Sequence, residues 1–301
     1  MGIEQLNNEF GLAGQLRFVD GKGGFPVAEV DNGLATARIS VYGGQLLSFR
    51  PAGQPEDLMF LSDGAYYQEG KAIKGGAPVC WPWFGPDPEG QGRPAHGFVR
   101  NRLWEVLGTE ALAEGATRIT LGLADDEQTR EIWPHRFRFS IEITVGSSVT
   151  LELVTANLGD EALTITQALH TYFRVGDIGQ AQLLGLDGND YLDKVDGGAQ
   201  KQQSGPVTIS GEVDRIYTGV EEDLIIDDPA LGRRIRIASG GSRSAVVWNP
   251  WSEIAAQMGD LADDDYTRML CVETTNAGPD VVQVPAGGEY RLTAKYTVER
   301  S

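Results

Sequence analysis

Residues 137–157 read FRFSIEITVGSSVTLELVTAN, and this stretch decides the fold class. Apolar and polar side chains alternate over 137–145, a short Gly-Ser-Ser turn occupies 146–148, and the alternation then runs back over 149–155. Successive side chains of a strand point to opposite faces, so this pattern predicts two antiparallel strands joined by a tight turn. One face of this hairpin should pack into a core.

The same strand-like alternation recurs over 36–49, around Ile39, Val41 and the glycine pair at 43–44. We expect further strand pairs in 103–123, with a turn near 114–115, and in 281–298. The 39 glycines and 14 prolines are typical of many short strands joined by turns in a sandwich or barrel. Helical windows are few, at 125–133 and 262–270, and 188–204 resembles a loop. No domain-scale linker or repeat occurs, so we expect one β-sandwich domain over 1–301, with its core over 30–298.

The chain has 301 residues and a formal net charge of -18 at pH 7, from 25 basic and 43 acidic residues. Nucleic acids and anionic membranes repel such a protein, so we expect neither as a partner. No basic region followed by an apolar run begins the chain, and no apolar stretch is long enough for a membrane helix. We therefore expect a cytoplasmic protein. Its two cysteines, Cys80 and Cys271, are too few for a disulfide framework and should be buried thiols.

One window has the opposite charge. Residues 71–102 contain five cationic side chains and only two acidic ones, which gives a local charge of +3 from the set Lys71, Lys74, Arg93, Arg100 and Arg102 against Asp87 and Glu89. A positive window in a negative chain indicates a small anionic ligand. Chance clustering on a solvated loop is the alternative interpretation.

His170 and Glu273 are ionisable residues in otherwise apolar, strand-like stretches. Burying a charged side chain without partners costs free energy, so packing alone does not explain them. An imidazole and a carboxylate can exchange protons near neutral pH without a metal or cofactor. His170 could instead be a core histidine bonded to a backbone carbonyl, and Glu273 could form a structural salt bridge. The sequence therefore offers them as a candidate acid–base pair.

Alternation around His170 predicts one polar and one apolar face of a strand. The polar face carries hydroxyl, imidazole, phenol and guanidinium groups, from Thr164, Thr166, His170, Tyr172 and Arg174 with Ala168 among them, and the apolar face carries Ile165, Leu169 and Phe173. A surface of the first kind suits a polyol. Glu273 shares its predicted face with Met269, Cys271 and Thr275, and its pKa should be raised unless it is well hydrogen-bonded.

The segment 74–86, KGGAPVCWPWFGP, combines a lysine beside two glycines with three prolines and three aromatic residues. Glycines let backbone amides approach an anion, and the prolines exclude a regular central strand. Trp81, Trp83 and Phe84 could stack on a sugar ring, or the segment could be a rigid aromatic loop that closes the core. Farther along, Arg100 has the forked donors that suit phosphate oxygens.

Several common site motifs are absent from the sequence, including phosphate-binding loops, nucleophile elbows, dinucleotide fingerprints and the zinc helix HExxH. The three histidines, His96, His135 and His170, lie far apart in sequence, so no metal site has support from spacing. We expect no cofactor, and His135 is interpreted as a loop residue.

Six segments in order carry a family resemblance: 74–85, 96–101, 169–173, 214–217, 248–251 and 271–273. Through these six segments together, the chain resembles the D-hexose-6-phosphate mutarotases, also called glucose-6-phosphate 1-epimerases, over residues 30–298. These proteins belong to the galactose mutarotase-like (aldose 1-epimerase) superfamily. The resemblance implies an all-β fold, a large antiparallel β-supersandwich with a few short helices. It also implies an isomerase that interconverts the α and β anomers of glucose 6-phosphate.

The resemblance further assigns roles to residues. His170 matches the family's general acid, Glu273 its general base, and Arg100 the arginine that contacts the sugar phosphate. Lys74 falls where many members carry arginine, a change that keeps the charge but loses the fork. His96 and Asp214 match positions that line the sugar site, although Asp214 could instead cap a turn.

Three alternatives stay open from the sequence. A non-catalytic carbohydrate-binding sandwich would show the same polar and aromatic residues without needing an acid–base pair. The chain could instead be an aldose 1-epimerase that acts on unphosphorylated sugars. A glycoside hydrolase or lyase would usually need a second, suitably spaced carboxylate, which the motif segments do not offer. We expect a monomer that binds a small sugar phosphate.

Overall fold

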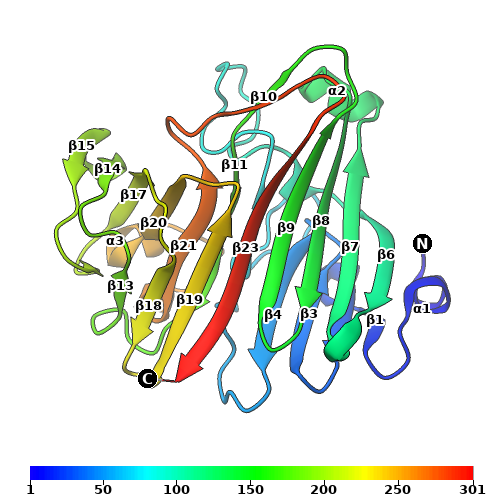
Figure 1. The fold of residues 1–301 in the computed structure, drawn as a ribbon, viewed down its shortest axis with the longest axis horizontal. Coiled ribbons are helices and arrows are strands. Elements are labelled where there is room, and N and C mark those ends of the chain that lie inside the picture. Colours follow the sequence, from blue (N-terminus) through cyan, green and yellow to red (C-terminus); the bar gives the residue numbers. More distant parts are fainter. Residues whose placement is uncertain (301) are drawn as a thin grey trace.

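The structure is a computed structural model that describes residues 1–300. The chain folds into antiparallel sheets, as the sequence predicts, and three of them are large (Figure 1). The N-terminal sheet has the order β1-β2-β3-β4, from strands β1 (Leu16–Asp20), β2 (Pro26–Asp31), β3 (Ala35–Ser40) and β4 (Gln45–Pro51).

The second sheet has nine strands in the order β16-β13-β18-β19-β23-β9-β8-β7-β6. Its strands are β6 (Glu105–Ala111), β7 (Thr117–Ala124), β8 (Phe137–Val145), β9 (Val149–Asn157), β13 (Gln182–Leu184), β16 (Val207–Thr208), β18 (Leu224–Asp228), β19 (Arg233–Gly240) and β23 (Glu289–Arg300). The long red β23 joins the green and yellow halves of this sheet in Figure 1.

The third sheet has eight strands and carries the candidate acid–base residues. Its order is β15-β14-β17-β20-β21-β11-β5, with β12 also paired to β21, from strands β5 (Val79–Cys80), β11 (Gln167–Leu169), β12 (Tyr172–Arg174), β14 (Asp190–Asp193), β15 (Ala199–Gln202), β17 (Val213–Thr218), β20 (Ser244–Asn249) and β21 (Met269–Asn276). A small separate sheet pairs β10 (Leu163–Ile165) with β22 (Val282–Val284).

Helices are short and lie at the ends of the sheets (Figure 1). The α-helices are α1 (Ile3–Phe10), α2 (Glu127–Ile132) and α3 (Trp251–Ala255), and the 3-10 helices are η1 (Lys22–Gly24), η2 (Val99–Asn101), η3 (Ala113–Gly115), η4 (Lys194–Asp196) and η5 (Asp265–Arg268). Among residues 1–300, no helix combines the length and apolar character that crossing a membrane would require.

Side chains from all three large sheets share one apolar core. Trp81, beside β5, stacks on Phe139 of β8 with ring centroids 4.4 Å apart, and Phe173 of β12 meets Tyr296 of β23 edge to face at 5.0 Å. Burial of large aromatic side chains is among the strongest contributions to such a core. These contacts hold the site-bearing sheet against the nine-stranded sheet.

Two of the three predicted strand pairs are confirmed, and the alternation over 36–49 also corresponds to strands. The opening hairpin forms β8 and β9 with Val145 opposite Val149, and the windows 36–49 and 103–123 contain β3–β4 and β6–β7. The window 281–298 does contain two strands, but they do not pair with each other. β22 pairs with β10, whereas β23 pairs with β9 and β19, because long-range partners were available to both.

Other local expectations differ from the structure. Helix α2 confirms the window 125–133, but 262–270 yields only η5 before β21 begins at Met269, because the pairing of Met269 and Leu270 with β12 overrides the local pattern. Segment 188–204 is not a plain loop, since β14 and β15 form a hairpin there. Helix α1 was not predicted.

Candidate active site

His170 faces Glu273 because of strand register. β11 and β12 both pair with β21, with Leu169 opposite Thr274 and Tyr172 opposite Cys271. Each pair of numbers sums to 443, so the same register places His170 opposite Glu273. Nδ1 of His170 lies 3.4 Å from Oε1 of Glu273.

The predicted continuous strand through His170 is wrong in detail. β11 ends at Leu169 and β12 begins at Tyr172, because the Thr171 amide donates to the carbonyl of Leu169 and bends the chain. The His170 amide donates to the Pro78 carbonyl instead of to β21. The apolar face was predicted correctly: Leu169 and Phe173 are buried in the core.

Burial governs the protonation of both groups. Glu273 is 1% exposed, and its Oε2 has no hydrogen-bond partner among the described residues. Burial raises the pKa of Glu273 well above its usual value, and the nearby charge of Asp214 adds to this. Burial likewise lowers the pKa of His170, with His96, Arg100 and Lys74 contributing in the same direction. These opposite shifts favour a neutral imidazole and disfavour an ionised carboxyl group.

Aromatic rings fix the plane of the imidazole. The Tyr172 ring stacks on His170 with centroids 5.0 Å apart and an angle of 11° between planes. Trp248 meets both rings edge to face at 6.0 Å. Stacked and edge contacts restrict ring rotation, so Nδ1 stays near the carboxyl group, although it makes no hydrogen bond within residues 1–300.

A cleft of about 380 Å³ opens over this pair. All six candidate residues predicted from the sequence line it, namely Lys74, His96, Arg100, His170, Asp214 and Glu273. A larger cavity of about 660 Å³ lies over β1–β4, but its lining includes neither histidine nor any of these six residues. We therefore regard the smaller cleft as the candidate site.

The aromatic lining differs from the expectation. Trp81 and Trp83 are 0% and 3% exposed and belong to the core, so the interpretation as a core-closing loop holds for them. Phe84 does line the cleft, together with Tyr172 and Trp248. Trp248 was not predicted as a lining residue, although it lies in a segment that carried the family resemblance.

His96 lies in a strained turn that fixes its tautomer. Its φ of 64° is rare for a residue other than glycine. The backbone N–H of Gly85 donates to its Nδ1 at 3.3 Å, so the ring proton is on Nε2. Burial and neighbouring cations lower the pKa of His96 to about 3. His96 is thus a neutral hydrogen-bond donor at the cleft.

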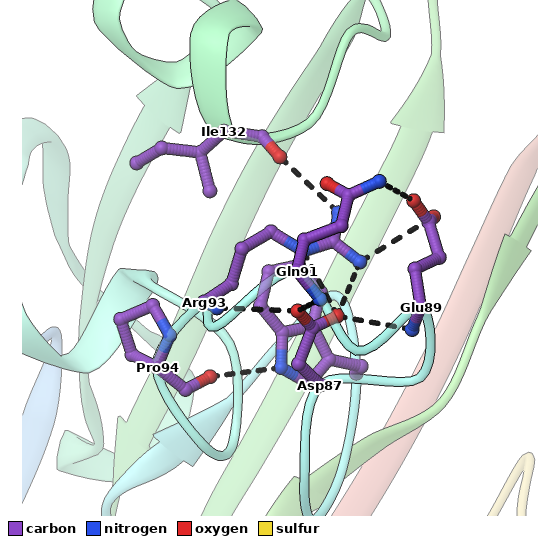
Figure 2. Close-up of polar contacts among 7 residues, drawn as sticks. Asp87, Glu89, Gln91, Arg93, Pro94 and Ile132 are labelled. Carbon is purple, nitrogen blue, oxygen red and sulfur yellow. Dashed lines mark hydrogen bonds and ion pairs between the residues drawn. The ribbon is translucent and has the colours of Figure 1, made fainter.

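A buried ion pair braces the loop that carries His96 (Figure 2). Arg93 donates to Asp87 through Nη2 at 2.6 Å and reaches the carbonyl of Ile132, and its guanidinium lies over the Trp83 ring. Asp87 also accepts the backbone amides of Glu89 and other loop residues, so its pKa is held well below the usual range, chiefly by Arg93. Arg93 is therefore structural and does not contribute free positive charge to the cleft.

The remaining cations do reach the cleft. Arg100 donates from Nη2 to the Ala95 carbonyl at 3.1 Å, while its buried Nε is unpaired within residues 1–300. Lys74 lies 3.4 Å from Asp260, a partner that the sequence did not reveal. Lys194 of η4 also lines the cleft. Lys194 was missed because segment 188–204 was interpreted as a loop. The turn residues of this segment, between alternating polar positions, could have indicated a hairpin.

Two other sequence expectations concern residues outside this chemistry. Both cysteines are free and buried, and burial raises the pKa of Cys80 to about 12. His135 follows α2 in a half-buried position and does not line the cleft. No group of three or more His, Cys, Asp or Glu side chains suited to a metal ion occurs in the described part of the chain.

Residues 26–297 match the family model described as Aldose 1-epimerase. The chain belongs to the aldose 1-epimerase family. Its fold is that of the galactose mutarotase-like proteins, and its activity is that of an isomerase, a mutarotase that exchanges the anomers of a sugar.

Relatives within this aldose 1-epimerase family are similar over most of their length. A curated Escherichia coli protein, provisionally named glucose-6-phosphate 1-epimerase, is 37% identical over 249 residues, covering 82% of each chain. A protein of the same provisional name from Cenchrus ciliaris is 33% identical, covering 85% of this chain and 79% of its own. The crystal structure of a provisionally assigned mutarotase from Salmonella typhimurium superposes with a TM-score of 0.88 at 31% identity, covering 99% of both chains.

Proposed function

We propose that this mutarotase interconverts the α and β anomers of aldohexose 6-phosphates such as glucose 6-phosphate. The observation that carries the proposal is the 3.4 Å contact between His170 and Glu273 in a cleft that Arg100 and Lys74 also line. The provisional names of the Escherichia coli and Cenchrus ciliaris relatives support the phosphorylated substrate.

Mutarotation needs two proton transfers. The C1 hydroxyl loses a proton while the ring oxygen gains one, the C1–O5 bond breaks, and an aldehyde forms. Rotation about C1–C2 then lets O5 attack the other face of the aldehyde, with both transfers reversed. In our proposal Glu273 accepts the proton from the C1 hydroxyl and His170 donates to O5. Each such transfer is worth about 10²- to 10⁴-fold in rate.

A single proton shared by His170 and Glu273 would suit this reaction. Productive substrate binding needs Glu273 ionised and His170 protonated, which is the arrangement reached when the shared proton crosses the 3.4 Å between them. No net proton has to be taken from solvent, because the total charge of the pair does not change. The closing step returns both groups to their starting forms, since the roles of acid and base reverse.

The other cleft residues would hold the sugar. We assign Arg100 to the phosphate because its buried, unpaired Nε leaves donor capacity for an anion. Lys74 would add a second charge there. His96, as a neutral donor, and Asp214, as an acceptor, would bind sugar hydroxyls. Binding the remote phosphate orients C1 between the acid and the base.

Exchange NMR or polarimetry on freshly dissolved α-glucose 6-phosphate, beside α-glucose, tests the proposal. Wild type should equilibrate the phosphorylated sugar more efficiently. Arg100→Ala should lower kcat/KM for glucose 6-phosphate far more than for glucose. The matched control is Arg102→Ala, since Arg102 does not line the cleft. Equal losses on the two sugars in Arg100→Ala would refute the phosphate assignment.

A further inference from the structure

A second, smaller cavity of about 240 Å³ adjoins the cleft. Three residues line both cavities: Lys74, Arg100 and Tyr172. The side cavity is also lined by Lys71 and Asp260, which do not line the main cleft. A ligand group that passes the Tyr172 ring therefore leaves the acid–base pair and enters a differently charged compartment.

The side cavity holds three cationic side chains and one carboxylate. Lys71, Lys74 and Arg100 supply three positive charges and Asp260 one negative charge, which leaves +2. A sugar phosphate carries a charge of about -1.5 to -2 at neutral pH. The net charge of the cavity therefore matches a phosphoryl dianion only when Asp260 is counted.

Asp260 has no other evident use. Its carboxylate lies 3.4 Å from the Lys74 ammonium, and the side chains of Lys74 and Asp260 are 16% and 20% exposed. Within residues 1–300, it accepts no hydrogen bond from a backbone amide or another side chain, unlike Asp265 five residues on, which bonds Ser62, Ala262 and Arg268. A carboxylate that neither caps a turn nor joins a network acts through its charge.

Asp260 is also held close to the cavity wall. The adjoining Gly259 lies against Tyr66, another lining residue, so closely that a Cβ at 259 would fall 2.5 Å from the Tyr66 hydroxyl. The close approach of Gly259 to Tyr66 leaves Asp260 beside the cavity, with its carboxylate 3.4 Å from Lys74.

We propose that Asp260 is a specificity-determining residue, an internal counter-ion that limits how tightly the side cavity binds phosphate. This inference rests on the proposed function, because it assumes that the phosphoryl group of the substrate enters the side cavity. Without Asp260 the surplus charge would hold any dianion, including inorganic phosphate. With Asp260, phosphate alone binds weakly, and the sugar contacts in the main cleft must add to the affinity.

The direction of the effect follows from Coulomb's law. A unit charge about 6 Å from a dianion in a water-like dielectric changes its affinity by about tenfold. Asp260→Asn and Asp260→Ser should therefore lower the Ki of inorganic phosphate about tenfold and lower the KM for glucose 6-phosphate. Asp260→Glu keeps the charge and should bind phosphate more weakly than Asp260→Asn does.

The experiment measures competitive inhibition by inorganic phosphate at constant ionic strength, together with kcat/KM for glucose 6-phosphate and glucose. Asp263→Asn is the matched control, because it removes an equal charge from the same loop outside the cavity. Its Ki should equal that of wild type. The proposal is overturned if the Ki of inorganic phosphate is unchanged or higher in both Asp260→Asn and Asp260→Ser. A higher Ki would indicate that Asp260 positions Lys74.

The two proposals fail separately. A wild type that uses glucose 6-phosphate no better than glucose refutes the proposed function, and the assumption about the side cavity falls with it. The wild type could prefer glucose 6-phosphate while Asp260→Asn has the same Ki for phosphate and the same ratio of kcat/KM values for the two sugars. That result would refute only the role of Asp260.

Discussion

Replacing Glu273 by glutamine should inactivate the protein and stabilise its fold. The buried carboxyl group has an unpaired Oε2 within the described chain and a raised pKa. Glutamine has nearly the same shape but no ionisable proton. Loss of the proposed base should cost about 10²- to 10⁴-fold in kcat/KM. Ionisable groups that are buried for catalysis commonly lower the stability of the fold.

The size of the stabilisation follows from proton linkage. Burial raises the pKa of folded Glu273 above its ordinary value of 4.5, so above that pH the folded chain binds more protons than the unfolded chain. Stability is therefore lost as pH rises from 4.5. Each pH unit costs at most about 1.4 kcal/mol, so the cost at pH 7 is limited to about 3.5 kcal/mol.

Thermal unfolding of wild type and Glu273→Gln at pH 7 and at pH 4.5 measures this effect. At roughly 2 °C per kcal/mol, the variant should gain up to about 7 °C in Tm at pH 7. The gain should shrink towards zero at pH 4.5, where the unfolded carboxyl also takes up its proton. Asp265→Asn is the contrasting control, since Asp265 is buried but bonded to Arg268 and Ser62 and should lose stability. A Glu273→Gln variant less stable than wild type at pH 7 would refute the reasoning.

Three further predictions concern the pH profile, the braced loop and the turn at Gly97. The plot of rate against pH should be bell-shaped. Asp214→Asn should move the alkaline limb of this plot to lower pH, because Asp214 helps to raise the pKa of Glu273. An alkaline limb that stays in place would contradict this. Asp87→Asn should lower kcat/KM with little change in that profile, since it releases Arg93 and the loop of His96 without altering charge at the pair; unchanged steady-state kinetics would count against the brace. Gly97→Ala should destabilise the fold by about 2 kcal/mol or more in urea unfolding, because its Cβ would lie 1.8 Å from the Trp81 carbonyl oxygen, whereas Gly90→Ala, with open space around it, should cost about 1 kcal/mol.

Much of the candidate site could be predicted from the sequence, because its residue types are unusual in their surroundings. An imidazole and a carboxylate in apolar strands are costly unless they have a use, so His170 and Glu273 stood out before any fold was known. The cations near residue 74 stood out against a chain of charge -18. The sequence did not reveal which cations are free. Arg93 is neutralised by Asp87, and Lys74 faces Asp260, which lies 186 residues away in the chain.

By itself, the sequence determined the fold class and its local hairpins, since alternation and turn chemistry act between residues close in the chain. The pair β8–β9 needs only a three-residue turn, and this turn sets the register by placing Val145 opposite Val149. Tertiary structure decided which distant strands pair. The window 281–298 looked like a hairpin but supplied strands to two different sheets, because each strand found a better partner far along the chain. The same long-range pairing set the register of β11 and β12 on β21, which brings His170 within 3.4 Å of Glu273.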